Sequence, residues 1–197
     1  MFRRLRLQFI TIASLAILFI LVFTVGIINT VRSFQTEQEI SKVLNTLTEN
    51  NGSFGKTKKI ETNQGREIPS DSFRFFSVTL SGDKVVSQDT SHTSLIDDEE
   101  AVSYALAASR MTSTLGTIRE KNINLSYQVS KVSKNKILVV FLDTTSYYNS
   151  SQALLSLSIL LSMFGFIFFV VIVSALSGIV IRPFIRNYEK QRRFITN

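Results

Sequence analysis

Two adjoining stretches decide the predicted fold: ALLSLSILLSMFGFIFFVVIVSALSGIVI, residues 153–181, and RPFIRNYEKQRRFITN, residues 182–197. The first contains 29 residues without a charge. An α-helix rises about 1.5 Å per residue, so about 20 apolar residues cross the hydrocarbon core of a bilayer. Residues 153–181 are therefore predicted to form a transmembrane helix, with enough length to cross the bilayer at a tilt.

The second stretch is strongly basic. It contains one acid, Glu189, and five basic residues: Arg182, Arg186, Lys190, Arg192 and Arg193. A basic segment at one end of a transmembrane helix marks the cytoplasmic side of the membrane. We therefore expect residues 182–197 to be a cytoplasmic juxtamembrane helix. Proline lacks a backbone N–H and restricts the residue before it, so a local bend or joint is expected at Arg182 and Pro183.

A second apolar run lies near the N-terminus. Residues 1–6 form a basic head with three arginines, and residues 7–31 then contain 25 residues without a charge. A secretory signal peptide opens in the same way, but its apolar region is about 7–15 residues long and ends at a small-residue cleavage site. The run here is longer and lacks a good site, so an uncleaved transmembrane helix is predicted. We expect the chain to cross the cell membrane twice, with both termini cytoplasmic and residues 32–152 extracytoplasmic.

The distribution of charge argues against a nucleic-acid-binding protein. The chain carries a net charge of +7, but residues 32–152 contain 14 basic and 14 acidic residues. The whole excess therefore lies on the two segments that flank the predicted membrane helices. No basic face remains on the predicted domain for DNA or RNA.

The sequence also lacks residues on which several classes of enzyme depend. It has no cysteine, which excludes disulfides, thiol catalysis and cysteine-ligated zinc. It contains no phosphate-binding loop, dinucleotide fingerprint or Ser/His/Asp set. We therefore expect no catalytic residue, no cofactor and no metal site in this chain.

Residues 32–152 are predicted to be one small α+β domain between the two membrane helices. Apolar residues spaced three and four apart predict an amphipathic helix over 33–50, which continues the first membrane helix and ends at Asn50-Asn51-Gly52. Gly116 is interpreted as a break in the pattern that follows the helix expected over 98–112. The remaining expected elements are a long loop over 53–72 with one short strand near 58–62, strands 73–80 and 84–88, a helix over 98–112, strands 123–131 and 136–143, and a turn and short connector over 144–152. The expected fold class is thus a membrane protein of α+β type with a small antiparallel sheet.

Several phrases resemble parts of bacterial sensor histidine kinases. The string RPFIRNYEKQRRFITN is similar to their membrane-exit helix, and FRFFSVTLSGDKVV and KILVVFLD resemble the first hairpin and last strand of their PAS-like extracytoplasmic domains of the Cache or PDC group. This resemblance implies that the chain is the sensor and transmembrane input half of a two-component kinase. In that family a phrase like FITN leads into the H-box, so the phosphoacceptor histidine and the ATP-binding region are expected beyond residue 197. The chain alone is then expected not to autophosphorylate.

The same resemblance implies how a signal passes. We expect a homodimer that binds an extracytoplasmic ligand and, as a full kinase, signals to a response regulator. A shift in the domain is expected to pass through strand 136–143 and connector 144–152 into the second membrane helix. Two alternatives remain open: a stand-alone two-helix membrane protein that regulates a partner, and the input domain of a chemoreceptor or cyclase, which normally continues through a HAMP segment.

Three residues are candidate ligand-binding residues, and each also has a purely structural interpretation. Asp97, followed by Glu100, has the pattern of a helix cap. Tyr127 is an aromatic residue on a predicted strand, where such residues are ordinary. Asp143 closes the last predicted strand before the turn. The single histidine, His92, is expected to be a solvated loop residue rather than a pH sensor or metal ligand.

Overall fold

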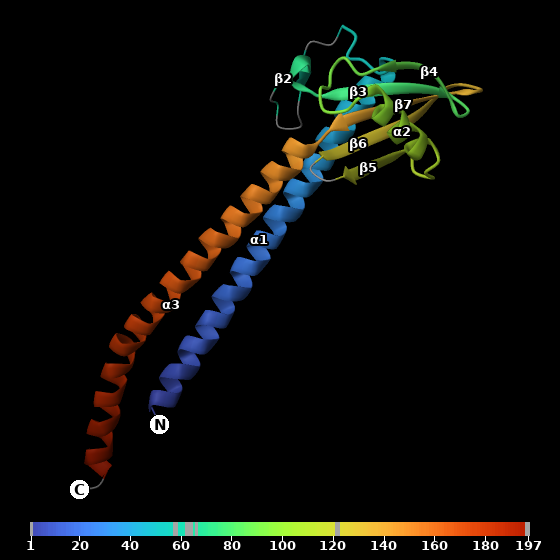
Figure 1. Cartoon of the computed structure of the whole chain (residues 1–197). Helices are drawn as coiled ribbons and strands as arrows, with labels where there is room; N and C mark the ends of the chain where they lie inside the picture. The colour runs from blue at the N-terminus through green and yellow to red at the C-terminus, as the bar shows by residue number, and fades with distance from the viewer. Residues whose placement is uncertain (1, 57–58, 62–64, 66, 121–122, 196–197) are drawn as a thin grey trace. The chain divides into compact units, whose positions relative to one another are not determined.

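The computed structural model describes residues 2–56, 59–61, 65, 67–120 and 123–195. The described chain contains three α-helices and two antiparallel sheets (Figure 1). The helices are α1 (Phe2–Glu49), α2 (Asp98–Ser109) and α3 (Thr145–Ile195). The chain divides into a helical unit, residues 1–31 and 152–197, and a sheet unit, residues 32–151.

The helical unit contains the apolar parts of α1 and α3. Both helices, over Arg6–Glu49 and Thr145–Ser177, contain an apolar stretch long enough to cross a membrane. Their large apolar side chains are exposed; Phe19 and Leu161, for example, are each 71% exposed. The predicted pair of apolar helices is therefore present, as judged by length and composition.

The sheet unit is built on five antiparallel strands in the order β4-β3-β7-β6-β5. These are β3 (Phe75–Ser81), β4 (Lys84–Asp89), β5 (Leu115–Glu120), β6 (Ile123–Ser133) and β7 (Lys136–Asp143). The last strand, β7, lies in the centre of the sheet between β3 and β6. Its sequence KILVVFLD is a nearly continuous apolar run because both faces of a central strand are covered here.

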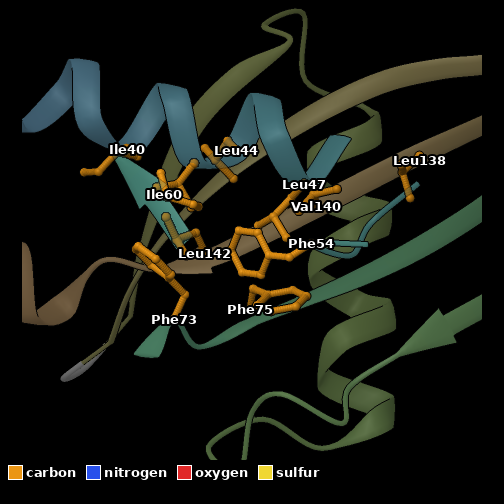
Figure 2. Close-up of a cluster of buried hydrophobic side chains, with 11 residues drawn as sticks. Ile40, Leu44, Leu47, Phe54, Ile60, Phe73, Phe75, Leu138, Val140 and Leu142 are labelled. Carbon is orange, nitrogen blue, oxygen red and sulfur yellow. The ribbon is translucent and has the colours of Figure 1, made fainter. Parts of the chain in front are cut away.

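One face of the sheet packs against the C-terminal part of α1. Ile40, Val43, Leu44 and Leu47 recur at helical spacing and are 5% exposed or less. They contact alternate residues of β7 and the phenylalanines that close the cluster (Figure 2). The Phe54 ring lies edge-on to the Phe75 ring, with 5.0 Å between the centroids. Burial of each large apolar side chain contributes about 1.5–3 kcal/mol to stability.

The opposite face packs against α2. The helix approaches the sheet through three buried alanines, Ala101, Ala105 and Ala108, whose small side chains permit close contact. The sheet supplies large residues in return, among them Phe76 and Phe141, whose rings stack with 4.6 Å between centroids. Alternate residues of β7 therefore enter two separate cores, one with α1 and one with α2.

The predicted end of α1 is confirmed. Helix α1 stops at Glu49, and Asn51 and Gly52 then adopt positive φ angles of 56° and 88°. Such a left-handed conformation favours asparagine and glycine, which is why this pair ends a helix. The Gly52 N–H donates to the Leu47 carbonyl at 2.8 Å, which satisfies one of the last carbonyl groups of the helix.

Strand β5 was not predicted. Gly116 was interpreted as a break, yet it lies inside β5 and pairs with Tyr127 on β6. A Cβ at position 116 would come within 2.5 Å of the Tyr127 hydroxyl. Glycine is therefore needed here because an aromatic ring covers the backbone, and not because the strand ends.

Two further regions were predicted only in part. The short strand expected near 58–62 is confirmed as β1 (Lys59–Glu61), but it pairs with a second strand that was not predicted, β2 (Glu67–Pro69), which is followed by a short 3-10 helix over Ser70–Ser72. The expected turn and connector over 144–152 are absent, since α3 already begins at Thr145. The physical reason is a set of helix-capping hydrogen bonds around Thr144.

Candidate functional site: the junction of strand β7 and helix α3

The three predicted ligand-binding residues have clear structural contacts. The Asp97 carboxylate accepts a hydrogen bond from the Glu100 backbone N–H at 2.8 Å and caps α2. Tyr127 is 1% exposed and lies in the core beneath α2. The Asp143 carboxylate accepts from the Thr145 backbone N–H at 2.9 Å. Ligand binding by any of the three stays a prediction.

The structure brings two of these three residues onto neighbouring strands. Asp143 pairs with Leu125 and Phe141 pairs with Tyr127, so Asp143 and Tyr127 lie two positions apart on the same face of the sheet. Asp97 lies on a different element, at the start of α2. Arg182 and Pro183 lie within α3, whose helical assignment continues through both. The joint expected there also stays a prediction.

The single histidine packs against an aromatic ring. His92 is exposed, and its ring stacks on Phe75 with 4.4 Å between centroids. Asp89 lies nearby, and a hydrogen bond from the Ser91 hydroxyl lowers the pKa of its carboxyl group. Among the residues that the structure describes, no group of three or more His, Cys, Asp or Glu side chains could hold a metal ion.

The most highly connected polar residues surround Thr144, the single residue between β7 and α3. Thr144 is fully buried, and both its N–H and its hydroxyl donate to the Asn124 carbonyl, at 2.8 and 3.0 Å. The Asn124 N–H in turn donates to the Thr145 hydroxyl oxygen at 2.9 Å. Both backbone groups of Asn124, at the start of β6, therefore hold the first residues of the helix.

A chain of hydroxyl groups extends this contact across the sheet. The Thr144 hydroxyl oxygen lies 3.1 Å from that of Ser126, which lies 3.3 Å from that of Thr117 on β5. A hydroxyl group has one hydrogen, and Thr144 donates its own to Asn124. Ser126 must then donate to Thr144, and Thr117 to Ser126. The chain has one consistent direction and links two strands to the start of α3.

A second set of contacts joins the first turn of α3 to its surroundings. The Tyr147 hydroxyl donates to the Glu39 carboxylate of α1 at 3.2 Å, and the half-buried ring packs against the core beneath α1. Burial, and then the negative charge of Glu39, raise the pKa of Tyr147. The Arg119 guanidinium of β5 lies over the Tyr148 ring, 5.1 Å from its centroid, in a cation–π contact.

Strand β7 and helix α3 are joined without a loop. Asp143 ends the central strand, and Thr145 begins the helix after one intervening residue, Thr144. Buried hydroxyl groups are costly to leave without partners, by about 1–3 kcal/mol each, so the junction resists separation from β6. We missed Thr144, Ser126 and Asn124 in the sequence. The signal was Asp143-Thr144-Thr145, a run of residues that favour the start of a helix.

A shallow groove lies elsewhere in the sheet unit, along α1. It has a volume of about 440 Å³, and its lining residues all belong to that helix: Gln38, Ser41, Lys42, Asn45, Thr46 and Glu49. Two of these side chains contact the rest of the unit. Lys42 donates to the Glu61 carbonyl at 2.5 Å, and Asn45 accepts from the Gln128 amide at 2.8 Å. The groove contains none of the three predicted ligand-binding residues.

Comparison of the chain with models of known protein families, with curated proteins and with solved structures finds no match in any of the three. The resemblance to sensor histidine kinases therefore stays a prediction.

Proposed function

We propose that this chain is the sensing and transmembrane input half of a membrane sensor of the histidine kinase type. The observation that carries the proposal is the junction: the central strand of the sheet passes through one buried residue, Thr144, into a helix long and apolar enough to cross a membrane. A folded unit that only needed an anchor would not require a hydrogen-bonded, linker-free connection of this kind.

The membrane topology follows from charge. The chain crosses the cell membrane twice, both termini are cytoplasmic, and residues 32–152 are a PAS-like domain outside the cell. The excess of basic residues on segments 1–6 and 182–197 supports this orientation, since lysine and arginine next to a membrane helix stay in the cytoplasm. Long segments such as residues 32–152 translocate largely regardless of their charge, so the basic residues in this segment do not oppose its export.

The sheet unit is suited to couple a ligand to the second helix. Strand β7 packs against α1 on one face and α2 on the other, so a rearrangement of either helix changes the contacts of β7. A ligand can shift such an equilibrium only as far as its affinities for the two states differ. A full switch requires a difference of about 5.5 kcal/mol.

The assignment to histidine kinases rests on the segment RPFIRNYEKQRRFITN. The proposal includes a homodimer, in which each chain supplies two helices to a four-helix membrane bundle. It also includes a response regulator as the downstream partner of the full kinase. Ser158, Ser162, Ser174 and Gly178 have the spacing of small residues found where membrane helices pack together.

The test of this assignment is the coding sequence after residue 197. An H-box histidine within about ten residues, followed by an ATP-binding region, supports the kinase, because these are the two catalytic parts that the resemblance implies beyond residue 197. A stop codon would instead support a stand-alone regulatory membrane protein. A HAMP segment would support a chemoreceptor or cyclase. Either of the last two results would overturn the kinase proposal.

A further inference from the structure

Met111 carries the only sulfur atom of the sheet unit. The chain has no cysteine and three methionines, Met1, Met111 and Met163, of which only Met111 lies between residues 32 and 151. It directly follows Arg110, the C-cap of α2, and is 52% exposed. A thioether in this position is open to oxidants dissolved in water.

The sulfur of Met111 contacts a residue of the core. The buried Tyr127 hydroxyl donates a hydrogen bond to Met111 Sδ at 2.9 Å. A thioether is a weak acceptor. Tyr127 is 1% exposed, so this weak acceptor is the hydrogen-bond partner of a phenol that has almost no access to water.

Tyr127 has no room to move away from Met111. Its ring lies 5.8 Å from the Phe141 ring, centroid to centroid, on the neighbouring strand β7. On the other side it covers Gly116 of β5, where even a methyl group would come within 2.5 Å of the hydroxyl. Any change at the Met111 sulfur must therefore be absorbed by Met111 and the end of α2.

We propose that Met111 is an oxidation site for two-electron oxidants of the peroxide and hypohalous acid classes. In the reaction with hydrogen peroxide, a sulfur lone pair attacks one peroxide oxygen and the O–O bond breaks. An S–O bond forms, and hydroxide leaves and takes up the remaining proton to give water. The sulfur is oxidised by two electrons and the peroxide is reduced by two. The product, methionine sulfoxide, is polar and a strong hydrogen-bond acceptor.

The new oxygen atom changes the contact between Met111 and Tyr127 at the end of α2. One lone pair of the sulfur accepts the Tyr127 hydroxyl hydrogen, with 2.9 Å between Tyr127 Oη and Met111 Sδ, so the added oxygen either takes the other lone pair or replaces this hydrogen bond. The Met111 N–H also donates to the carbonyl of Ala108, which is fully buried against the sheet. Moving Met111 outward therefore strains the last turn of α2. This inference does not depend on the proposed sensor function.

The site lies next to the junction described above. Tyr127 is adjacent in sequence to Ser126, whose hydroxyl donates to Thr144 at the start of α3. The two residues point to opposite faces of β6, because successive side chains of a strand alternate. If the chain is a sensor, oxidation of Met111 alters a contact of Tyr127, and Tyr127 is the sequence neighbour of Ser126 in the junction.

The experiment uses the full chain in lipid nanodiscs, treated with hydrogen peroxide. Oxidation of Met111 is followed by peptide mass spectrometry, and the structural effect by the melting temperature and the near-ultraviolet circular dichroism of the tyrosines. M111L removes the reactive sulfur and keeps the volume, and M163L is the matched control that removes the other internal sulfur. Y127F keeps the sulfur and removes its donor.

We expect Met111 to be oxidised at a rate within about tenfold of a free methionine amide, as suits an exposed thioether. Oxidation should lower the melting temperature of the wild type and of M163L and should change their tyrosine spectrum. M111L should show neither effect, and Y127F a smaller change in melting temperature. The proposal is overturned if Met111 reacts far more slowly, or if the oxidised wild type melts like oxidised M111L.

Discussion

Thr144 shows how much a single buried hydroxyl group can organise. It lies between the central strand and α3, and its hydroxyl donates to Asn124 while accepting from Ser126. A valine has nearly the same shape but lacks both functions. The junction therefore depends on a polar group where an apolar residue of equal size would fit.

Replacement of Thr144 by valine tests this residue. We expect T144V to lower the free energy of unfolding by about 1–3 kcal/mol, because the Ser126 hydroxyl and the Asn124 carbonyl lose a buried partner. T112V, at an exposed threonine, is the matched control and should change stability by less than about 0.5 kcal/mol. Thermal or urea unfolding followed by circular dichroism measures both. Equal effects of the two variants would show that the buried hydroxyl has no special role.

The raised pKa of Tyr147 predicts that the stability of the folded state depends on pH. The raised pKa means that the folded state retains the phenolic proton at pH values where the unfolded chain, with a tyrosine pKa of about 10, has lost it. The folded state then binds more protons, so its stability is constant below about pH 10 and falls as the pH rises above that value.

Removal of this hydroxyl should weaken that dependence. We expect Y147F to lose about 1 kcal/mol near neutral pH, through the missing bond to Glu39, and to show a shallower decline of stability above about pH 10. The comparison variant is Y104F. A hydrogen bond to the Glu120 carboxylate, and then burial, raise the pKa of Tyr104 to about 12, so part of the decline should persist in Y147F and disappear in the double variant. An unchanged pH profile in Y147F would contradict the assignment.

At the scale of elements, α2 shows how a sequence pattern and a contact agree. The helix begins with Asp98, Glu99 and Glu100 in its first turn, and Asp97 caps it. Four acids in a row resemble a cation site, yet the positive end of the helix dipole and the unpaired N–H groups account for acids at this position. The contact of Asp97 with the Glu100 N–H is direct.

Three substitutions separate the capping hydrogen bond of Asp97 from an effect of its negative charge. D97A should destabilise the protein by about 1 kcal/mol, because it leaves a helix N–H without its acceptor. D97N should retain most of the stability, since asparagine caps equally well. E99A, in the same acidic cluster, should have little effect. If D97N destabilises as much as D97A, the negative charge rather than the cap is the important property of Asp97.

At the scale of the whole molecule, the two apolar helices and the charge on their flanks predict a topology. The chain has no cysteine, so a single introduced cysteine is the only target for a thiol reagent. Lys134 is suitable because it lies in the exposed turn between β6 and β7. Asn197 is suitable because it ends the basic segment that is expected in the cytoplasm.

We expect K134C to react with a membrane-impermeant maleimide in intact cells. N197C should react only after the membrane is permeabilised, because the positive-inside rule retains its segment in the cytoplasm. The extent of labelling, measured by a mass shift on a gel, decides the result. Labelling of N197C in intact cells, or protection of K134C, would contradict the proposed orientation.

Features that depend on neighbouring residues in the chain were predictable from the sequence. An uninterrupted apolar run of sufficient length is a local property, and both long helices were found from it. The stop of α1 at Asn51 and Gly52 and the cap at Asp97 were found because each residue type has an intrinsic conformational preference. Strand β7 was predicted with its observed bounds because its apolar run is flanked by turn residues.

Only the tertiary structure decided what brings distant residues together. The central position of β7 results from its pairing with β3 and β6, which lie on either side of it in the sheet but both precede it in the chain. Gly116 lies in a strand because it pairs with Tyr127, whose ring leaves no space for a larger side chain. Thr144 precedes the helix and is held there by Asn124 and Ser126. These partners are 11 to 20 residues away in sequence. The sequence determined the apolar spans and the local starts and stops, whereas packing between segments determined the sheet order, the junction and the environment of Met111, because such contacts leave no local pattern.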